Sequence, residues 1–233
     1  MTSKSAEPIT IAGEDGISVS GLLLAPMRAR ACYVLAHGAG AGMNHPFMVA
    51  VAVELSQRGI ATLRYQFPYM ERGGGRPDPP AVAQATVRAA VAAAQRAAPS
   101  LPLIAGGKSF GGRMTSQAQA KRPLPGVCRL AFLGFPLHPA GKPSQERGKH
   151  LFEVSIPMLF LQGTRDTLAM LDQIEPLCGA LGARATLKLF EDADHSFHVP
   201  ARTGRKDADV RGDMLDALAA WTDGATKARA SAR

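Results

Sequence analysis

With 233 residues, 46% of them hydrophobic and 20% charged, the chain is long enough for one sizeable α/β domain and short for two. Its formal net charge is +8, but lysine and arginine are scattered along the chain, which argues against a nucleic-acid partner. No apolar run approaches the roughly 18 residues of a membrane span, and the opening residues lack the apolar core of a signal peptide, so we expect a cytoplasmic protein without a membrane partner.

The start of the chain predicts an antiparallel hairpin. Strand-like segments at 8–12 and 17–25 are joined through the turn-rich residues 13–16, Gly-Glu-Asp-Gly. The next segment, 31–36, is a continuous apolar run, which is typical of a strand covered on both faces of a sheet. From this point we expect strands to alternate with helices.

The rest of the chain supports that alternation. Irregular segments are expected at 67–80, which is rich in proline and glycine, and at 136–155, which has room for one short helix. The remaining expected elements are helices at 46–58, 81–98, 111–121, 168–181 and 210–222, and strands at 60–65, 101–106, 127–135, 158–162 and 185–190.

This order predicts one α/β domain over residues 1–225, followed by a flexible tail at 226–233. A hairpin followed by repeated strand–helix units gives a mostly parallel sheet with helices on both faces. Because the connections are short, notably after the strand at 127–135, we expect no substantial cap domain and an open site.

The most informative motif is Gly-Lys-Ser-Phe-Gly at 107–111, which follows an apolar strand and leads into a helix. A Gly-x-Ser-x-Gly in that context is typical of a nucleophile elbow, a strained turn that exposes the serine hydroxyl above the sheet. The glycines are needed where strand and helix approach closely. The same residues do not complete a phosphate loop, because its first glycine is replaced by Pro102.

An activated serine needs a base and an acid that orients the base, here expected in the order Ser, Asp, His. After Ser109, Asp166 and His195 lie where two consecutive later strands end, so we predict a catalytic triad of these three residues. Alternatives exist for each partner. Asp166 could serve only as a helix N-cap, Asp192 and Asp194 are rival acids, and His198 is a rival base.

An oxyanion hole requires two backbone amides that face the developing negative charge. We expect one from Phe110, the residue after the nucleophile, and one from the glycine-rich loop that begins at His37. Ala39 is the preferred second donor and Gly40 its rival. His37 itself is expected to be a structural hydrogen-bonding residue.

Residues near these motifs are candidates for an apolar acyl pocket or its border. Ordinary core packing is an equal interpretation for Phe47 and Phe67, and Lys108 and Arg113 either contact an anionic substrate or point to solvent. The candidates are Gly40, Met43, His45, Phe47, Tyr69, Lys108 and His138. No metal or other cofactor is expected, because the chain shows no spacing typical of metal ligands and its three cysteines are far apart.

These motifs resemble the α/β-hydrolase superfamily over nearly the whole chain. More narrowly they resemble its small cap-less branch, related to the testis-expressed hydrolase-like protein and to the hydrolase-like subunit of the non-specific-lethal chromatin complex. The residues that carry the resemblance are 37–40, 43–47, 64–65, 67–68, 106–113, 136–139, 163–166 and 194–197.

By this resemblance Ser109, Asp166 and His195 would be the triad. The dienelactone-hydrolase group is similar in size but typically carries a cysteine nucleophile, so its substrate is not carried over to a chain with Ser109. The function expected is therefore a serine hydrolase acting on a small-molecule ester or related acyl compound. The alternative is a non-catalytic interaction module that keeps the fold, as the chromatin-complex relative suggests.

Overall fold

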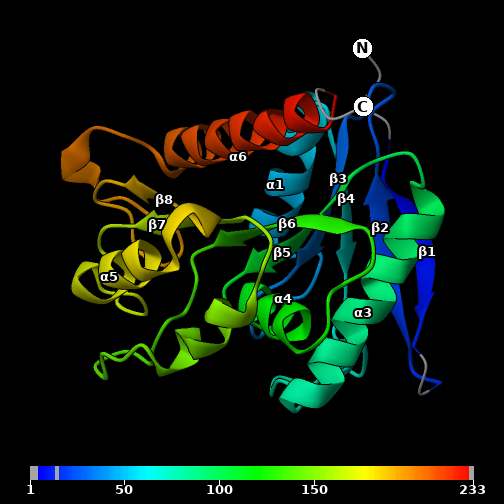
Figure 1. Ribbon diagram of the computed structural model, residues 1–233, viewed down its shortest axis with the longest axis horizontal. Coiled ribbons are helices and arrows are strands. Elements are labelled where there is room, and N and C mark those ends of the chain that lie inside the picture. Colours follow the sequence, from blue (N-terminus) through cyan, green and yellow to red (C-terminus); the bar gives the residue numbers. More distant parts are fainter. Residues whose placement is uncertain (1–4, 14–15, 231–233) are drawn as a thin grey trace.

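A sheet of eight strands runs through the centre of the computed structural model, which describes residues 5–13 and 16–230 (Figure 1). The strand order is β1-β2-β4-β3-β5-β6-β7-β8, with β1 and β2 antiparallel to their neighbours and the other strands parallel. The strands are β1 (Glu7–Ala12), β2 (Ser18–Leu24), β3 (Ala31–Ala36), β4 (Ile60–Tyr65), β5 (Leu103–Lys108), β6 (Val127–Leu133), β7 (Met158–Gly163) and β8 (Ala185–Phe190).

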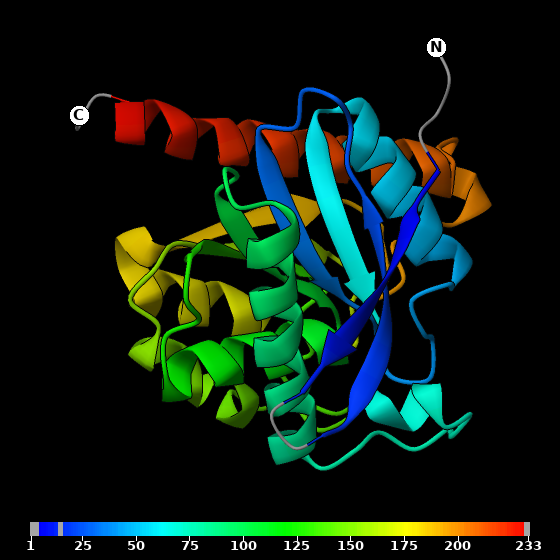
Figure 2. The same ribbon diagram turned by 90° about the vertical axis from the view of Figure 1, so that its right-hand side faces the viewer.

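Helices cover both faces of the sheet. Figure 2 shows α3 along one face, together with α4 and α5, whereas α1 and α6 pack on the other. The α-helices are α1 (Pro46–Gln57), α2 (Pro68–Glu71), α3 (Pro80–Ala97), α4 (Phe110–Lys121), α5 (Leu171–Leu181) and α6 (Asp207–Ala230), and short 3₁₀ helices lie at η1 (Glu146–Glu153), η2 (Gly182–Arg184) and η3 (Ala201–Thr203).

Strand β3 shows why its sequence is apolar throughout. Its side chains alternate between the two faces, so Tyr33 and Leu35 lie in the core under α1 and α6, whereas Val34 and Ala36 lie in the core under α3 and α4. All of these residues are buried. Burial on both faces is what a central parallel strand requires.

The predicted fold class is confirmed: a mostly parallel sheet with an N-terminal antiparallel hairpin and helices on both faces. Three strands, β3, β4 and β8, begin and end where the sequence places them. Residues Glu14 and Asp15 of the predicted hairpin turn, and residues 231–233 of the predicted tail, lie outside the described residues.

Several element boundaries were predicted wrongly. The loop at 67–80 contains α2, which starts at Pro68 and whose Tyr69 amide donates to the Asp78 carboxylate at 2.7 Å. Helix α5 starts at Leu171 rather than 168, because the Met170 amide donates to His138 instead of continuing a helical turn. Helix α6 is longer than predicted at both ends and includes residues 226–230 of the predicted tail.

The long connection between β6 and β7 does not form a cap. It carries only η1 as regular structure, and η1 packs beside α4 and α5 rather than over the carboxyl ends of the strands. In the described part of the chain, no helix combines the length and the apolar character needed to cross a membrane.

Candidate active site

The turn between β5 and α4 holds Ser109 in a strained conformation, with φ 49° and ψ −117°. The two flanking glycines make this turn sterically feasible. A Cβ added at Gly107 would lie 2.2 Å from the carbonyl oxygen of Ala36, and one at Gly111 would lie 2.6 Å from the Ala36 side chain. Strand β3 therefore approaches the turn too closely for any larger residue at these positions.

A chain of hydrogen bonds joins three side chains from three strand ends. His195 Nε2 lies 2.8 Å from Ser109 Oγ, and His195 Nδ1 lies 2.6 Å from Asp166 Oδ2. The Asp166 side chain is fully buried, whereas that of His195 is 21% exposed. Because Asp166 accepts from Nδ1–H, the Nε2 atom of the neutral ring is free to accept the Ser109 hydroxyl proton.

The buried amide of Gln162 anchors the Asp166 carboxylate. Its Nε2 atom donates to Asp166 Oδ2, while its Oε1 atom accepts from the Phe135 amide at 2.9 Å. The other carboxylate oxygen accepts from the Leu168 amide at 2.8 Å. Sequence reasoning missed Gln162, although a polar residue near the end of the otherwise apolar strand β7 was a usable signal.

The rival acids and the rival base are engaged elsewhere. Asp194 Oδ1 accepts from the amides of Ser196 and His198, at 2.7 and 3.0 Å, and so fixes its own loop. Asp192 pairs with Arg202. The exposed His198 ring contacts the Asp207 carboxylate, which raises the pKa of the ring.

His37 holds the glycine-rich loop after β3 from inside the core. Its Nε2 atom accepts from the Phe67 amide at 3.1 Å, and its Nδ1 atom lies 2.7 Å from the Gly38 carbonyl oxygen, to which it donates. Burial lowers the pKa of His37 to about 4, so the ring is neutral at physiological pH. The residue has the structural environment expected for it.

The amides proposed for an oxyanion hole differ in their hydrogen bonding. Gly40 donates its amide proton to the Tyr69 hydroxyl at 3.0 Å, so this amide is already used. The Ala39 amide makes no hydrogen bond within the described part of the chain. Phe110 is the first residue of α4, where backbone amides have no partner inside the helix. The Phe110 ring packs against the Phe67 ring, with the two ring centroids 5.3 Å apart.

Two predicted pocket residues, Met43 and Tyr69, hold this loop instead of lining the cavity. The Met43 amide donates to Gln66 Oε1 and its carbonyl oxygen accepts from the buried guanidinium of Arg64, at 2.9 and 2.8 Å. The Tyr69 side chain is buried behind Gly40. A fixed loop is what a preorganised set of amide donors requires.

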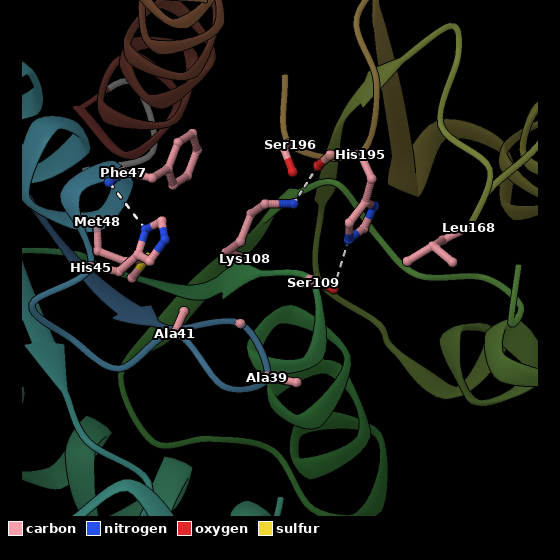
Figure 3. Close-up of a pocket in the computed structure, with 11 residues that line it drawn as sticks. Ala39, Ala41, His45, Phe47, Met48, Lys108, Ser109, Leu168, His195 and Ser196 are labelled. Carbon is pink, nitrogen blue, oxygen red and sulfur yellow. Dashed lines mark hydrogen bonds between the residues drawn. The ribbon is translucent and has the colours of Figure 1, made fainter. Parts of the chain in front are cut away.

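A cavity of about 320 Å³ opens beside Ser109 and His195 (Figure 3). Of the predicted pocket residues, His45, Phe47 and Lys108 line it, as does Ala39, whereas Gly40 does not. Sequence reasoning missed other lining residues because they come from four separate loops and helices, and these are Gly38, Ala41, Met48, Leu168 and Ser196. Most of the lining is apolar.

His138 does not reach this cavity. It is fully buried, and its Nε2 atom accepts from the Met170 amide at 3.2 Å, while its own amide donates to the Leu168 carbonyl oxygen at 2.9 Å. It therefore fixes the turn that presents Leu168 to the cavity. Among the residues that the structure describes, no group of three or more His, Cys, Asp or Glu side chains could hold a metal ion.

Comparisons with known proteins agree with this architecture. An alpha/beta serine hydrolase homologue from Coxiella burnetii superposes with a TM-score of 0.74 at 19% identity, covering 94% of this chain and 100% of the other. A serine hydrolase without a lid from Xanthomonas campestris superposes with a TM-score of 0.73 at 21% identity, covering 95% of this chain and 97% of the other. A dienelactone hydrolase from Anabaena variabilis superposes with a TM-score of 0.75 at 19% identity, covering 94% of this chain and 97% of the other.

At these identities the solved structures establish the fold. The narrower resemblance to the testis-expressed and chromatin-complex proteins stays a prediction. A family model described as an alpha/beta hydrolase domain matches residues 29–223, from the loop before β3 into α6. The chain therefore belongs to the alpha/beta hydrolase family.

Proposed function

We propose that the protein is a serine hydrolase that cleaves an ester or related acyl bond of a small molecule through an acyl-enzyme intermediate. The observation that carries this proposal is the hydrogen-bond chain from Ser109 through His195 to Asp166, with its serine end open to the cavity. The order of these contacts is the one that a nucleophile, its base and an orienting acid require, and it supports this proposal.

In the first half-reaction, Ser109 Oγ attacks the substrate carbonyl carbon while His195 Nε2 takes the hydroxyl proton. Asp166 stabilises the imidazolium that forms and keeps its Nδ1–H directed inward. The carbonyl oxygen gains negative charge, and the amides of Phe110 and Ala39 are the donors we assign to it. His195 then gives its proton to the leaving group, so the C–O bond breaks and the acyl group stays on Ser109.

In the second half-reaction, water replaces the leaving group. His195 removes a proton from this water, whose oxygen attacks the acyl carbon, and the same proton returns to Ser109 Oγ as the carboxylic acid leaves. This route uses only groups of the chain and water. The His195 side chain is 21% exposed and lines the cavity, so water has access to it.

The comparisons support hydrolysis as the class of reaction. Proteins of this fold include ones described as a serine hydrolase homologue, a lid-less serine hydrolase and an esterase domain from Rhodothermus marinus. The mostly apolar lining of the cavity beside Ser109, to which Phe47 and Met48 contribute, supports a substrate with an apolar acyl group.

The test is covalent labelling with a fluorophosphonate probe, combined with turnover of p-nitrophenyl esters of increasing acyl length. Wild-type protein and Ser100→Ala, a control at an exposed serine before β5, are expected to be labelled and to turn over esters. Ser109→Ala is expected to lose both. Undiminished labelling of Ser109→Ala would contradict the assignment. A wild-type protein that is not labelled by the probe and hydrolyses none of the esters would favour a non-catalytic interaction module.

A further inference from the structure

Lys108, the residue before the nucleophile, reaches the loop that carries His195. Its Nζ atom donates to the backbone carbonyl oxygen of His195 at 2.5 Å (Figure 3). The same atom lies 5.5 Å from the centre of the Phe197 ring. Gly134 leaves the space for this contact. A Cβ there would lie 3.0 Å from Lys108 Nζ and 3.2 Å from the His195 carbonyl oxygen.

His195 is therefore held at three atoms. Asp166 fixes ring atom Nδ1, Ser109 contacts ring atom Nε2, and Lys108 fixes the backbone of the same residue. Because Lys108 and Ser109 are adjacent, one rigid turn sets the position of the nucleophile and of the loop that carries its base. Proton transfer depends steeply on the distance between Ser109 Oγ and His195 Nε2, since a misplacement of about 1 Å can lower a rate about 100-fold.

We propose that Lys108 is a positioning residue, whose ammonium group clamps the His195 backbone so that the imidazole stays within hydrogen-bonding distance of Ser109. This inference rests on the proposed hydrolase function for its kinetic consequences. Its structural content, a loop tethered by one lysine, is independent of turnover and can be measured separately.

The surroundings of the ammonium group make the clamp sensitive to pH. None of the salt bridges between described residues includes Lys108. Burial lowers the pKa of Lys108 to about 8, and the charges of Asp166 and Asp194 only partly oppose this effect. The other titratable rings that line the cavity are His195 and, across the cavity, His45. Above about pH 8 the ammonium becomes an amine, and its hydrogen bond to the carbonyl loses the strength that a charged donor provides.

The geometry favours this role over recognition of a substrate anion. The ammonium group is directed at the His195 carbonyl and packs beside Gly134, and the lysine stem lies near Gly38. The ammonium group has three N–H donors, and the one contact that the structure gives it is with this backbone carbonyl. Substrate recognition and positioning also predict different results for the same variant, so an experiment can separate them.

The experiment compares Lys108→Met, which keeps the length of the side chain but removes the donor, with Lys108→Arg, which keeps a donor charged at every accessible pH. Lys121→Met, at an exposed position at the end of α4, is the matched control. For p-nitrophenyl butyrate we expect Lys108→Met to lower kcat about 10- to 100-fold with little change in KM. The wild-type rate is expected to decline above about pH 8, and this decline should be absent from both Lys108 variants.

Two further measurements make the outcomes decisive. Amide hydrogen exchange of the segment 191–200 is expected to be faster in Lys108→Met, and unchanged in Lys121→Met, whether or not the protein turns over esters. The mono-p-nitrophenyl ester of glutaric acid carries an acyl carboxylate, and a positioning role predicts that Lys108→Met lowers its kcat by the same factor as that of the butyrate.

Unchanged exchange together with unchanged kcat for the butyrate would overturn the proposal. So would a loss confined to the carboxylated ester, which would make Lys108 an anion-binding residue. If Lys108→Met does not fold, Lys108→Arg decides, because retention of the wild-type alkaline decline in that variant contradicts the clamp. A wild-type protein without Ser109-dependent chemistry refutes the hydrolase proposal alone, and the exchange experiment still tests the tether.

Discussion

Replacing Gln162 by methionine tests how much the anchoring of Asp166 contributes to the site. Methionine has nearly the same length and fills the same buried space, but it has no donor and its thioether sulfur is only a weak acceptor. The variant leaves the Phe135 amide without its acceptor and removes one of the three donors to the Asp166 carboxylate, the others being the Leu168 amide and the His195 ring.

The expected magnitude follows from these two losses. An orphaned buried amide costs about 1–3 kcal/mol, and a lost hydrogen bond to a charged group about 1.5–3 kcal/mol. The free energy of unfolding of Gln162→Met should therefore fall by about 3–5 kcal/mol, which lowers Tm by roughly 10 °C in a domain of this size. Because a less constrained carboxylate orients His195 less well, kcat should also fall about tenfold or more.

Thermal unfolding and p-nitrophenyl ester turnover measure the two effects. Gln162→Glu is the informative companion, because it keeps an acceptor for the Phe135 amide but sets a carboxyl group against Asp166. In that variant the two carboxyl groups hold a shared proton to a higher pH than either would alone, so both stability and kcat should fall as the pH rises and the pair loses that proton. If Gln162→Met kept wild-type Tm and kcat, the idea that this amide anchors the acid would be refuted.

Three other predictions concern the elbow, the loop after β3 and the stability of the fold. Gly111→Ala places a Cβ 2.6 Å from the Ala36 side chain and should lower the free energy of unfolding by about 1–3 kcal/mol, measured by chemical denaturation. Tyr69→Phe removes the acceptor of the Gly40 amide and should lower kcat a few-fold while costing about 1 kcal/mol of stability; an unchanged kcat would show that the loop holds without it. Burial lowers the pKa of His150 to about 4, so its contribution to stability is present above about pH 6.5 and is lost as the pH falls toward 4. Between about pH 4 and 6.5, the slope of the unfolding free energy against pH should therefore be smaller in His150→Gln than in the wild type, by at most about 1.4 kcal/mol per pH unit. An identical slope in both proteins would contradict the assignment.

The sequence was sufficient to predict the sheet and the positions of the three triad candidates. Apolar strands mark the core, and the carboxyl ends of parallel strands lie along one edge, so Ser109, Asp166 and His195 could be expected together. Their hydrogen-bonded contact in the structure follows from this topology.

Sequence could not show which way the loops around the site face. Met43 and Tyr69 are close to the site motifs in sequence, but neither lines the cavity. Met43 is hydrogen-bonded to side chains at the end of β4, and the Tyr69 hydroxyl accepts from the Gly40 amide. Leu168 reaches the cavity from a turn whose carbonyl oxygen accepts from the amide of His138, which lies on the connection between β6 and β7. Such contacts between segments far apart in sequence have no local periodicity or spacing that a reader of the chain could detect.

The connection between β6 and β7 packs at the side of the molecule, and this has a consequence for how selectivity can arise. An enzyme with a lid can discriminate between substrates by the energy of closure, because only a good ligand drives the movement. In the described part of the chain this connection forms no cap over the strand ends, so substrate entry and product release need no gating motion of that kind. Discrimination must then come from the fixed walls of the cavity, and changes at Phe47, Met48 or Leu168 are the direct way to alter what the protein accepts.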